Sequence, residues 1–134
     1  MTSVAADCLF CKIVKGVIPC HKVAETATTL AFLDINPLSS GHTLVIPKYH
    51  AQFMHQLPDE SLADLLPVAK KVALAQGPAD NYNILQNNGR LAHQAVIPKP
   101  NKAEGLEISW PSKPTDHAAF AALAKELSEK VGKL

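Results

Sequence analysis

The chain of 134 residues lacks an apolar run of about 18 residues, the length that a membrane-spanning helix needs. Its first residues, MTSVAADC, lack the basic flank and the apolar stretch of an export signal. Its net charge is only +1, which gives no electrostatic case for holding a nucleic-acid backbone. These absences predict a protein without a membrane or nucleic-acid partner, located in the cytoplasm, with the nucleus as a second compartment.

Cysteine is also scarce, and its count of three is odd, so a complete disulfide framework is excluded and reduced thiols are expected. Hydrophobic residues make up 47% of the chain, enough for one domain over residues 1–134 with its own core. Cys8 and Cys11 form a C-x-x-C pair after which a short helix or turn is expected. Such a pair supplies two of the four ligands of a structural zinc site, and the alternative is two buried free thiols.

Two apolar runs, Leu30–Ile35 and Thr43–Ile46, flank a cluster of turn-forming residues at 36–41, which predicts neighbouring antiparallel strands. His42 begins the second run and shares a face with its apolar residues. It is therefore either a hydrogen-bonded core residue or a site residue at the mouth of a strand.

Helical spacing follows from Pro58 to Gly77, with acidic residues in the first turn. The predicted core stripe consists of Leu62, Leu65, Leu66, Ala69, Val72 and Ala73. Pro67 should bend this helix unless its face is open to water. A second helix, about 116–131, is expected after a Thr115–Asp116 cap, with an apolar stripe of its own.

Between the helices, Tyr82–Gln86 is expected to be a strand that ends at the turn signal Asn87–Gly89. From Leu91 to Ile97 at most one short strand fits before Pro98 ends it.

Five separate stretches together resemble the histidine triad family of nucleotide-binding proteins, in the fungal form of its Hint branch. They are CLFCK (8–12), AFLDI (31–35), GHTLVIPKYH (41–50), YNILQNNGRLAHQ (82–94) and IPK (97–99). The resemblance covers residues 8–111. It implies an α+β fold with a five-stranded antiparallel sheet, a homodimer and a pocket for a purine nucleotide. The implied activity is hydrolysis of adenosine 5′-phosphoramidates and aminoacyl-adenylates to AMP, with no cofactor required for catalysis.

The resemblance also assigns residues. Asp34 and Ile35 match the contacts to the ribose and the base, Asn87 matches the asparagine near the phosphate, and Gln94 falls in the phosphate-side loop. His42 matches the auxiliary histidine beside the triad.

Three further residues match zinc ligands of the zinc-binding members. These are Cys8, Cys11 and His50, and the family's fourth ligand is a triad histidine. The resemblance therefore implies a structural zinc site that lacks one protein ligand.

One departure concerns the catalytic strand. The family pattern His-x-His-x-His would follow Gln94, but only Ala95 and Val96 precede Ile97, so about seven residues and the nucleophilic histidine are missing by comparison. His93 is the nearest substitute in sequence.

Loss of a central strand would remove several buried side chains, each worth about 1.5–3 kcal/mol. The chain could recover by drawing Leu91–Ile97 into the vacant position. Three interpretations stay open: a phosphoramidase whose strand was lost through splicing or a gene-model error, an inactive nucleotide-binding or dimerising module, or a variant that folds poorly.

Overall fold

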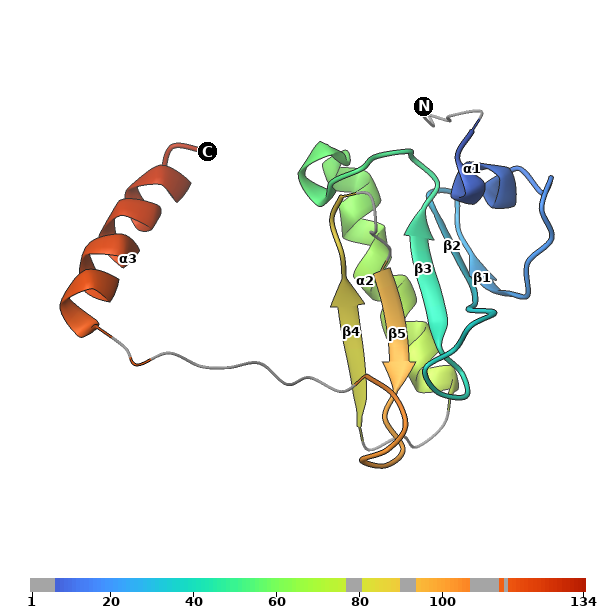
Figure 1. The fold of residues 1–134 in the computed structure, drawn as a ribbon. Helices are drawn as coiled ribbons and strands as arrows, with labels where there is room; N and C mark the ends of the chain where they lie inside the picture. Colours follow the sequence, from blue (N-terminus) through green and yellow to red (C-terminus); the bar gives the residue numbers. More distant parts are fainter. Residues whose placement is uncertain (1–6, 77–80, 90–93, 107–113, 115) are drawn as a thin grey trace.

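The structure, a computed structural model, describes residues 7–76, 81–89, 94–106, 114 and 116–134. The elements in chain order are α1 (Leu9–Val14), β1 (Lys22–Glu25), β2 (Thr29–Leu33), β3 (Thr43–Pro47), a 3₁₀ turn (Met54–Gln56), α2 (Asp59–Ala75), β4 (Tyr82–Gln86), β5 (Gln94–Pro98) and α3 (His117–Val131). Five antiparallel strands form one sheet in the order β1-β2-β3-β5-β4 (Figure 1). The predicted α+β class is confirmed. None of the helices in the described ranges is long and apolar enough to cross a bilayer.

The β2–β3 pair has the predicted antiparallel arrangement, with registers from Leu33 opposite Thr43 to Thr29 opposite Pro47. Both faces of this pair are buried. Ala31 and Val45 face α2, whereas the residues next to them in each strand belong to a second core cluster on the opposite face, against which α1 residues pack. Burial on both faces explains why these strands are nearly continuous apolar runs.

β5 is an interior strand that lies between β3 and the edge strand β4. It pairs with β4 along its whole length, from Tyr82 opposite Pro98 to Gln86 opposite Gln94. With β3 it forms only two pairs, ending at Leu44 opposite Ala95. The segment Leu91–Ile97 is predicted to fill the place of the missing strand, and its residues Gln94–Ile97 lie in β5, between β3 and β4. Residues 91–93 lie outside the described residues, and the loss of a strand stays a prediction.

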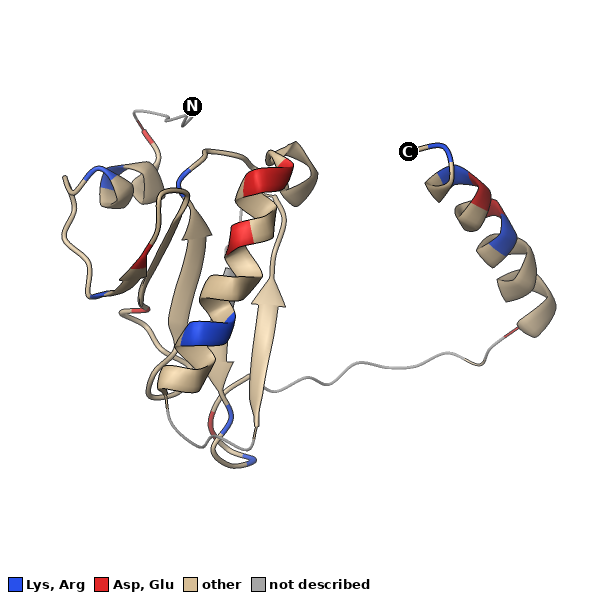
Figure 2. Ribbon diagram, turned by 180° about the vertical axis from the view of Figure 1, so that it is seen from behind, with Lys and Arg blue, Asp and Glu red and all other residues tan. Residues whose placement is uncertain are grey.

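α2 packs on the sheet through one side. Leu65, Val68 and Val72 are at most 3% exposed, but Leu66, predicted to be core, is 59% exposed. The prediction for Leu66 was wrong because the sheet covers only part of the helix circumference, and at about 100° per residue Leu66 falls with Pro67 on the uncovered part. Pro67 lies on the exposed side, and the helix continues through it. Figure 2 marks acidic residues in the first half of α2 and basic residues in its second half.

α3 begins at the predicted cap, where Asp116 Oδ1 accepts hydrogen bonds from the N–H groups of Ala118 and Ala119, both at 3.1 Å. None of its side chains is buried, including the apolar stripe that begins at Phe120. In Figure 1 the helix stands apart from the sheet. The assignment of residues 1–134 to one domain stays a prediction.

Candidate functional site

Asp34 and His42 meet where β2 ends and β3 begins. The Asp34 N–H donates a 2.9 Å hydrogen bond to the His42 carbonyl oxygen, which continues the β2–β3 ladder beyond the strands. The side chains also approach, with His42 Nε2 3.6 Å from Asp34 Oδ2. His42 is 5% exposed and Asp34 17%, so the pair is largely screened from water.

Backbone groups of the connecting loop hold both side chains. The Leu38 N–H donates to His42 Nδ1 at 3.1 Å, which assigns the proton of a neutral ring to Nε2, the nitrogen beside Asp34. The Asn36 N–H donates to Asp34 Oδ1 at 2.8 Å. His42 is thus a buried, hydrogen-bonded residue that also lies beside Asp34, and its role as a site residue stays a prediction.

Two side chains that the sequence did not single out position this loop. Gln76, at the end of α2, donates from Nε2 to the Gly41 carbonyl oxygen and, at 3.0 Å, to Thr43 Oγ1, so it holds both neighbours of His42. Ser39, 5% exposed, donates from Oγ to the Pro98 carbonyl oxygen at 2.6 Å. These partners are 33 to 59 residues apart, so no local pattern in the sequence indicated them.

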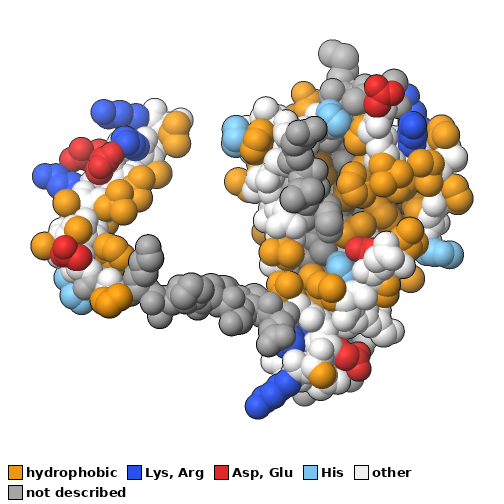
Figure 3. Space-filling view, viewed as in Figure 1, with side chains coloured by type: hydrophobic (Ala, Val, Ile, Leu, Met, Phe, Trp, Pro, Cys, Tyr) orange, Lys and Arg blue, Asp and Glu red, His pale blue; other side chains and the backbone are white. Residues whose placement is uncertain are grey.

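Ile35 follows Asp34 and is 81% exposed. An apolar side chain so open to solvent beside a half-buried carboxylate offers a surface to a flat apolar group. Figure 3 shows other apolar side chains on the same side of the molecule as α1, β2 and β3. The predicted contact of Ile35 with a base stays a prediction.

Cys8, Cys11 and His50 form a second cluster. Cys8 precedes α1, Cys11 lies in its first turn, and His50 follows β3. Their ligand atoms all lie within 4.8 Å of one another, and Cys11 Sγ is 3.3 Å from His50 Nδ1. Tetrahedral zinc would place such a sulfur and nitrogen about 3.5 Å apart, so the donor set and its spacing fit this ion. Cys20, the third cysteine, packs instead against the core cluster that contains Leu30.

A cavity of about 420 Å³ lies beside this cluster, between the end of β3 and the end of β4. Its wall includes all three residues of the cluster and the segment Gln86–Gly89, hence the predicted phosphate contact Asn87. Hydrogen bonds fix this segment: Asn88 Oδ1 accepts from the Met54 N–H at 2.7 Å, and the Gly89 N–H donates to the Gln52 carbonyl oxygen at 2.9 Å.

The predicted residues therefore fall into two groups. β3 and β4 both run antiparallel to β5, so the start of β3, with Asp34 and His42, and the end of β4, with Asn87, lie at opposite ends of the sheet. Gln94 is the first residue of β5, and His93 lies outside the described residues. The nucleotide roles of these residues stay predictions.

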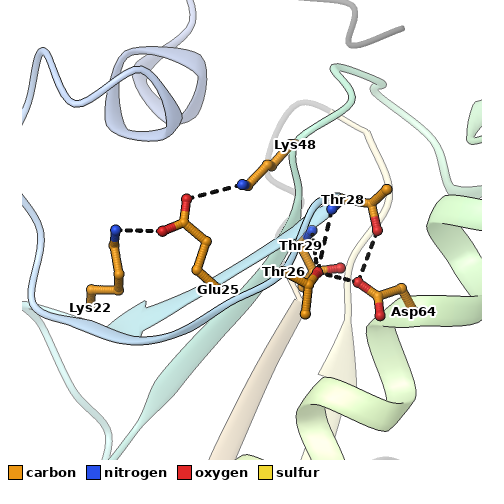
Figure 4. Close-up of polar contacts among 7 residues, drawn as sticks. All are labelled: Lys22, Glu25, Thr26, Thr28, Thr29, Lys48 and Asp64. Carbon is orange, nitrogen blue, oxygen red and sulfur yellow. Dashed lines mark hydrogen bonds and ion pairs between the residues drawn. The ribbon is translucent and has the colours of Figure 1, made fainter.

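Two carboxylates near the β1–β2 turn have lowered pKa values (Figure 4). Hydrogen bonds from Thr26 and other threonine side chains lower the pKa of Asp64 on α2. Lys22 and then Lys48 lower the pKa of Glu25 to about 2. Each pKa shift is thus explained by neighbouring side chains, the threonines for Asp64 and the lysines for Glu25.

The sequence model of the HIT domain family matches residues 15–98 of this chain. The adenosine 5′-monophosphoramidase of Schizosaccharomyces pombe is 60% identical over 132 residues, which cover 93% of this chain and 98% of that protein. The crystal structure of the histidine triad nucleotide-binding protein of Candida albicans has a TM-score of 0.84 and 42% identity, covering 95% of this chain and 99% of that one.

A zinc-bound histidine triad family protein of Mycobacterium smegmatis has a TM-score of 0.66 and 31% identity, and the match covers 96% of this chain and 98% of that one. The domain match takes in β1 to β5 and α2, the elements that carry the Asp34–His42 pair. The chain belongs to the HIT family.

Proposed function

We propose that this protein binds a purine nucleoside monophosphate, AMP or a 5′-amide of AMP, beside Asp34. The observation that carries the proposal is the pair of the buried His42 and the half-buried Asp34 at the mouth of β3, next to the exposed Ile35. The match to a protein named adenosine 5′-monophosphoramidase supports the same class of ligand.

The chemistry of the pair suits a nucleoside. Asp34 Oδ1 is engaged by the Asn36 N–H, and its carboxylate retains lone pairs that can accept hydrogen bonds from ribose hydroxyls. Ile35 offers apolar contact to the base. Asn87, with side-chain amide donors, lies at the far end of the sheet, so a nucleotide that touches both groups would extend along the strands.

Turnover by the family mechanism needs a histidine that attacks phosphorus from about 3–3.5 Å, and a misplacement of about 1 Å can cost a hundredfold in rate. β5, between β3 and β4, consists of Gln94, Ala95, Val96, Ile97 and Pro98 and has no imidazole. We therefore propose binding with strongly reduced turnover. Any residual activity is assigned to His93, the histidine next to β5 in the sequence.

Calorimetric titration with AMP tests the proposal, with Asp34→Ala as the variant and Glu129→Ala, an exposed carboxylate on α3, as the control. Binding should weaken at least about tenfold in the first variant, the loss expected when charge-assisted hydrogen bonds disappear. It should be unchanged in the control. Equal affinity of both variants, or no binding of the unaltered chain at millimolar AMP, would contradict the proposal. Release of AMP from adenosine 5′-phosphoramidate, measured with and without His93→Ala, reports turnover.

We also propose that Cys8, Cys11 and His50 hold a zinc ion. When bound, the ion would cross-link α1 to the segment after β3, and thiolate and imidazole are the donors that zinc prefers. Metal analysis after dialysis should give one zinc per chain, retained by Cys20→Ser and lost in Cys11→Ser. Equal zinc content in these two variants would assign the metal elsewhere.

We infer that the protein is a homodimer whose two subunits contact each other through β4. This strand is at one edge of the sheet, and its Tyr82 and Ile84 are 49% and 45% exposed. The side chains of Tyr82 and Ile84 lie on the face of the sheet on which α2 packs over the other strands. Leu66 of α2 adds exposed apolar surface. Light scattering after size exclusion should give a dimer mass, and Ile84→Lys should give a monomer. A monomer mass for the unaltered chain would contradict the inference.

A further inference from the structure

We propose that Cys8 and Cys11 are an oxidisable dithiol, which hydrogen peroxide converts to a Cys8–Cys11 disulfide when no metal is bound. Their Sγ atoms lie within 4.8 Å of each other. Cys8 caps the start of α1 and Cys11 is the third residue of the helix. A C-x-x-C pair at a helix start is the arrangement found in thiol–disulfide oxidoreductases. The inference does not depend on nucleotide binding.

The pair is accessible from the cavity. Both residues line the 420 Å³ space between β3 and β4, which is large enough to admit a peroxide molecule. Cys20, which packs against the core cluster containing Leu30 and Phe32, gives the chain an internal reference thiol. Cys20 is half-buried, as Cys8 is, but it lies outside the cluster of Cys8, Cys11 and His50, so proximity distinguishes the pair from Cys20.

Closure requires a modest movement, because a disulfide brings the two sulfurs to about 2.05 Å. Cys8 has extended backbone angles, φ −83° and ψ 124°, and lies just outside the helix. Its side chain can therefore turn toward Cys11 without breaking an N–H hydrogen bond of the helix, since the first N–H groups have no partner within it.

The chemistry balances with peroxide as the oxidant. The sulfur of one cysteine attacks a peroxide oxygen, the O–O bond breaks, and a sulfenic acid and one water form. The second sulfur then attacks the sulfenic sulfur, the S–S bond forms, the S–O bond breaks, and a second water leaves. Two thiols and one peroxide thus give one disulfide and two waters. The thiols supply both electrons, and their protons leave in the water.

The same sulfurs are the donors of the proposed zinc site. A sulfur in a disulfide has no thiolate to offer a metal, and a metal-bound thiolate is held away from the other sulfur. Zinc and the disulfide therefore exclude each other. The cluster therefore has two states. In one, a metal ion links the two cysteines to His50, and in the other, a disulfide joins the two cysteines and His50 has no metal link to them.

The test uses the full chain, reduced and freed of metal with a chelator, then exposed to hydrogen peroxide. Remaining thiols are alkylated before trypsin digestion. Cys8 and Cys11 fall in one tryptic peptide, residues 1–12, and Cys20 falls in another, residues 16–22. The proposal predicts that peptide 1–12 loses about 2 Da and takes up no alkylating agent, the signature of an internal disulfide. An alkylated peptide 1–12, or one oxidised at both sulfurs without a bridge, would overturn it.

Two variants and one addition complete the test. Cys20→Ser should form the bridge as the unaltered chain does, whereas Cys11→Ser should leave a sulfenic acid on Cys8 that a dimedone reagent captures. A bridge that depends on Cys20 would overturn the proposal. Prior incubation with zinc chloride should keep peptide 1–12 fully alkylatable. Bridge formation at an equal rate with zinc would overturn the exclusion of the two states.

Discussion

Asp64 and Glu25 show how the surroundings of a carboxylate decide what its charge contributes (Figure 4). Asp64 accepts hydrogen bonds from the hydroxyls of Thr26 and, at 2.8 Å, Thr28, and so joins α2 to the β1–β2 turn. Glu25 forms ion pairs with Lys22 at 2.5 Å and Lys48 at 3.0 Å. Water and salt screen the ion pairs of Glu25, because the lysine side chains are flexible and the site is exposed. The two threonine hydroxyls beside Asp64 are instead held in place by the turn.

Asp64→Ala should lower the free energy of unfolding by about 1 kcal/mol at neutral pH, because hydrogen bonds to a charged acceptor are lost. The folded pKa of Asp64 is below the ordinary value of 3.8. The contribution is therefore complete above that value and is lost as the pH falls through the lower, folded pKa. Urea unfolding at pH 7 and at decreasing pH below 4 checks this, and a difference independent of pH would contradict it.

Glu25→Gln is the control for that series. The pKa of Glu25 is lowered to about 2, but its ion pairs are exposed, and exposed ion pairs contribute little to stability. The variant should change the unfolding midpoint only slightly at low salt, and not at all at high salt.

Gly105 and Gly16 form a matched pair of glycines with positive φ, 89° and 78°. A Cβ at Gly105 would lie 2.6 Å from the Pro98 carbonyl oxygen, whereas one at Gly16 would meet nothing within 4 Å. Gly16→Ala should cost about 1 kcal/mol from backbone strain alone, and Gly105→Ala about 2–3 kcal/mol because the backbone of Pro98 must also move. Thermal unfolding of both variants checks this, and equal costs would show that the loop after β5 does not pack on Pro98 as described.

At the scale of elements, β5 decides whether the sheet is continuous. It is five residues long and includes a proline, yet Val96 and Ile97 are 0% and 1% exposed and contribute to opposite core clusters. Pro98 can close the strand because a strand's last residue is one of the places where a missing N–H is tolerated. The segment thus joins β3 to β4 and separates the two clusters.

Ile97→Ala should destabilise the fold by about 2–5 kcal/mol, the cost of a cavity at a fully buried isoleucine. Against a typical total of about 5–15 kcal/mol, this is a large share. Ile35→Ala, at a position 81% exposed, is the control and should be nearly neutral in the absence of nucleotide. Chemical unfolding of both variants gives the comparison, and similar midpoints would mean that β5 is not buried between β3 and β4.

Local patterns predicted most of these elements. Alternating or continuous apolar runs identified β2, β3 and β4, and Asp116 identified the start of α3. The sequence could not separate Leu66 from Val68 on α2, because both fit a broad apolar stripe and only the position of the sheet decides which is buried.

For the candidate sites, sequence resemblance selected Cys8, Cys11 and His50, which the structure brings together, and Asp34 with His42, which it also brings together. Gln76 and Ser39 were missed, because their roles depend on contacts that form only after α2 and β5 have packed. Side chains that position others have no motif of their own, so packing identified them.

For the molecule as a whole, the sheet with α1 and α2 forms the packed body, and α3 adds no buried side chain to it. A chain ending at Lys113 should therefore have a free energy of unfolding within about 0.5 kcal/mol of that of the full chain, because the described residues that it lacks are all exposed. Urea unfolding followed by the fluorescence of Trp110, which both chains retain, makes the comparison. A larger decrease in the free energy of unfolding would show that α3 stabilises the packed body of the sheet, α1 and α2.

The central claim is that this chain folds with Gln94–Pro98 between β3 and β4 and keeps a nucleotide site beside Asp34. Thermal unfolding with and without AMP tests both parts in one experiment. The account predicts a single cooperative transition that AMP raises, by about 2.7 kcal/mol at a concentration of 100 times its Kd. A trace without a cooperative transition would contradict the fold, and a cooperative transition that AMP leaves unmoved would contradict the nucleotide site.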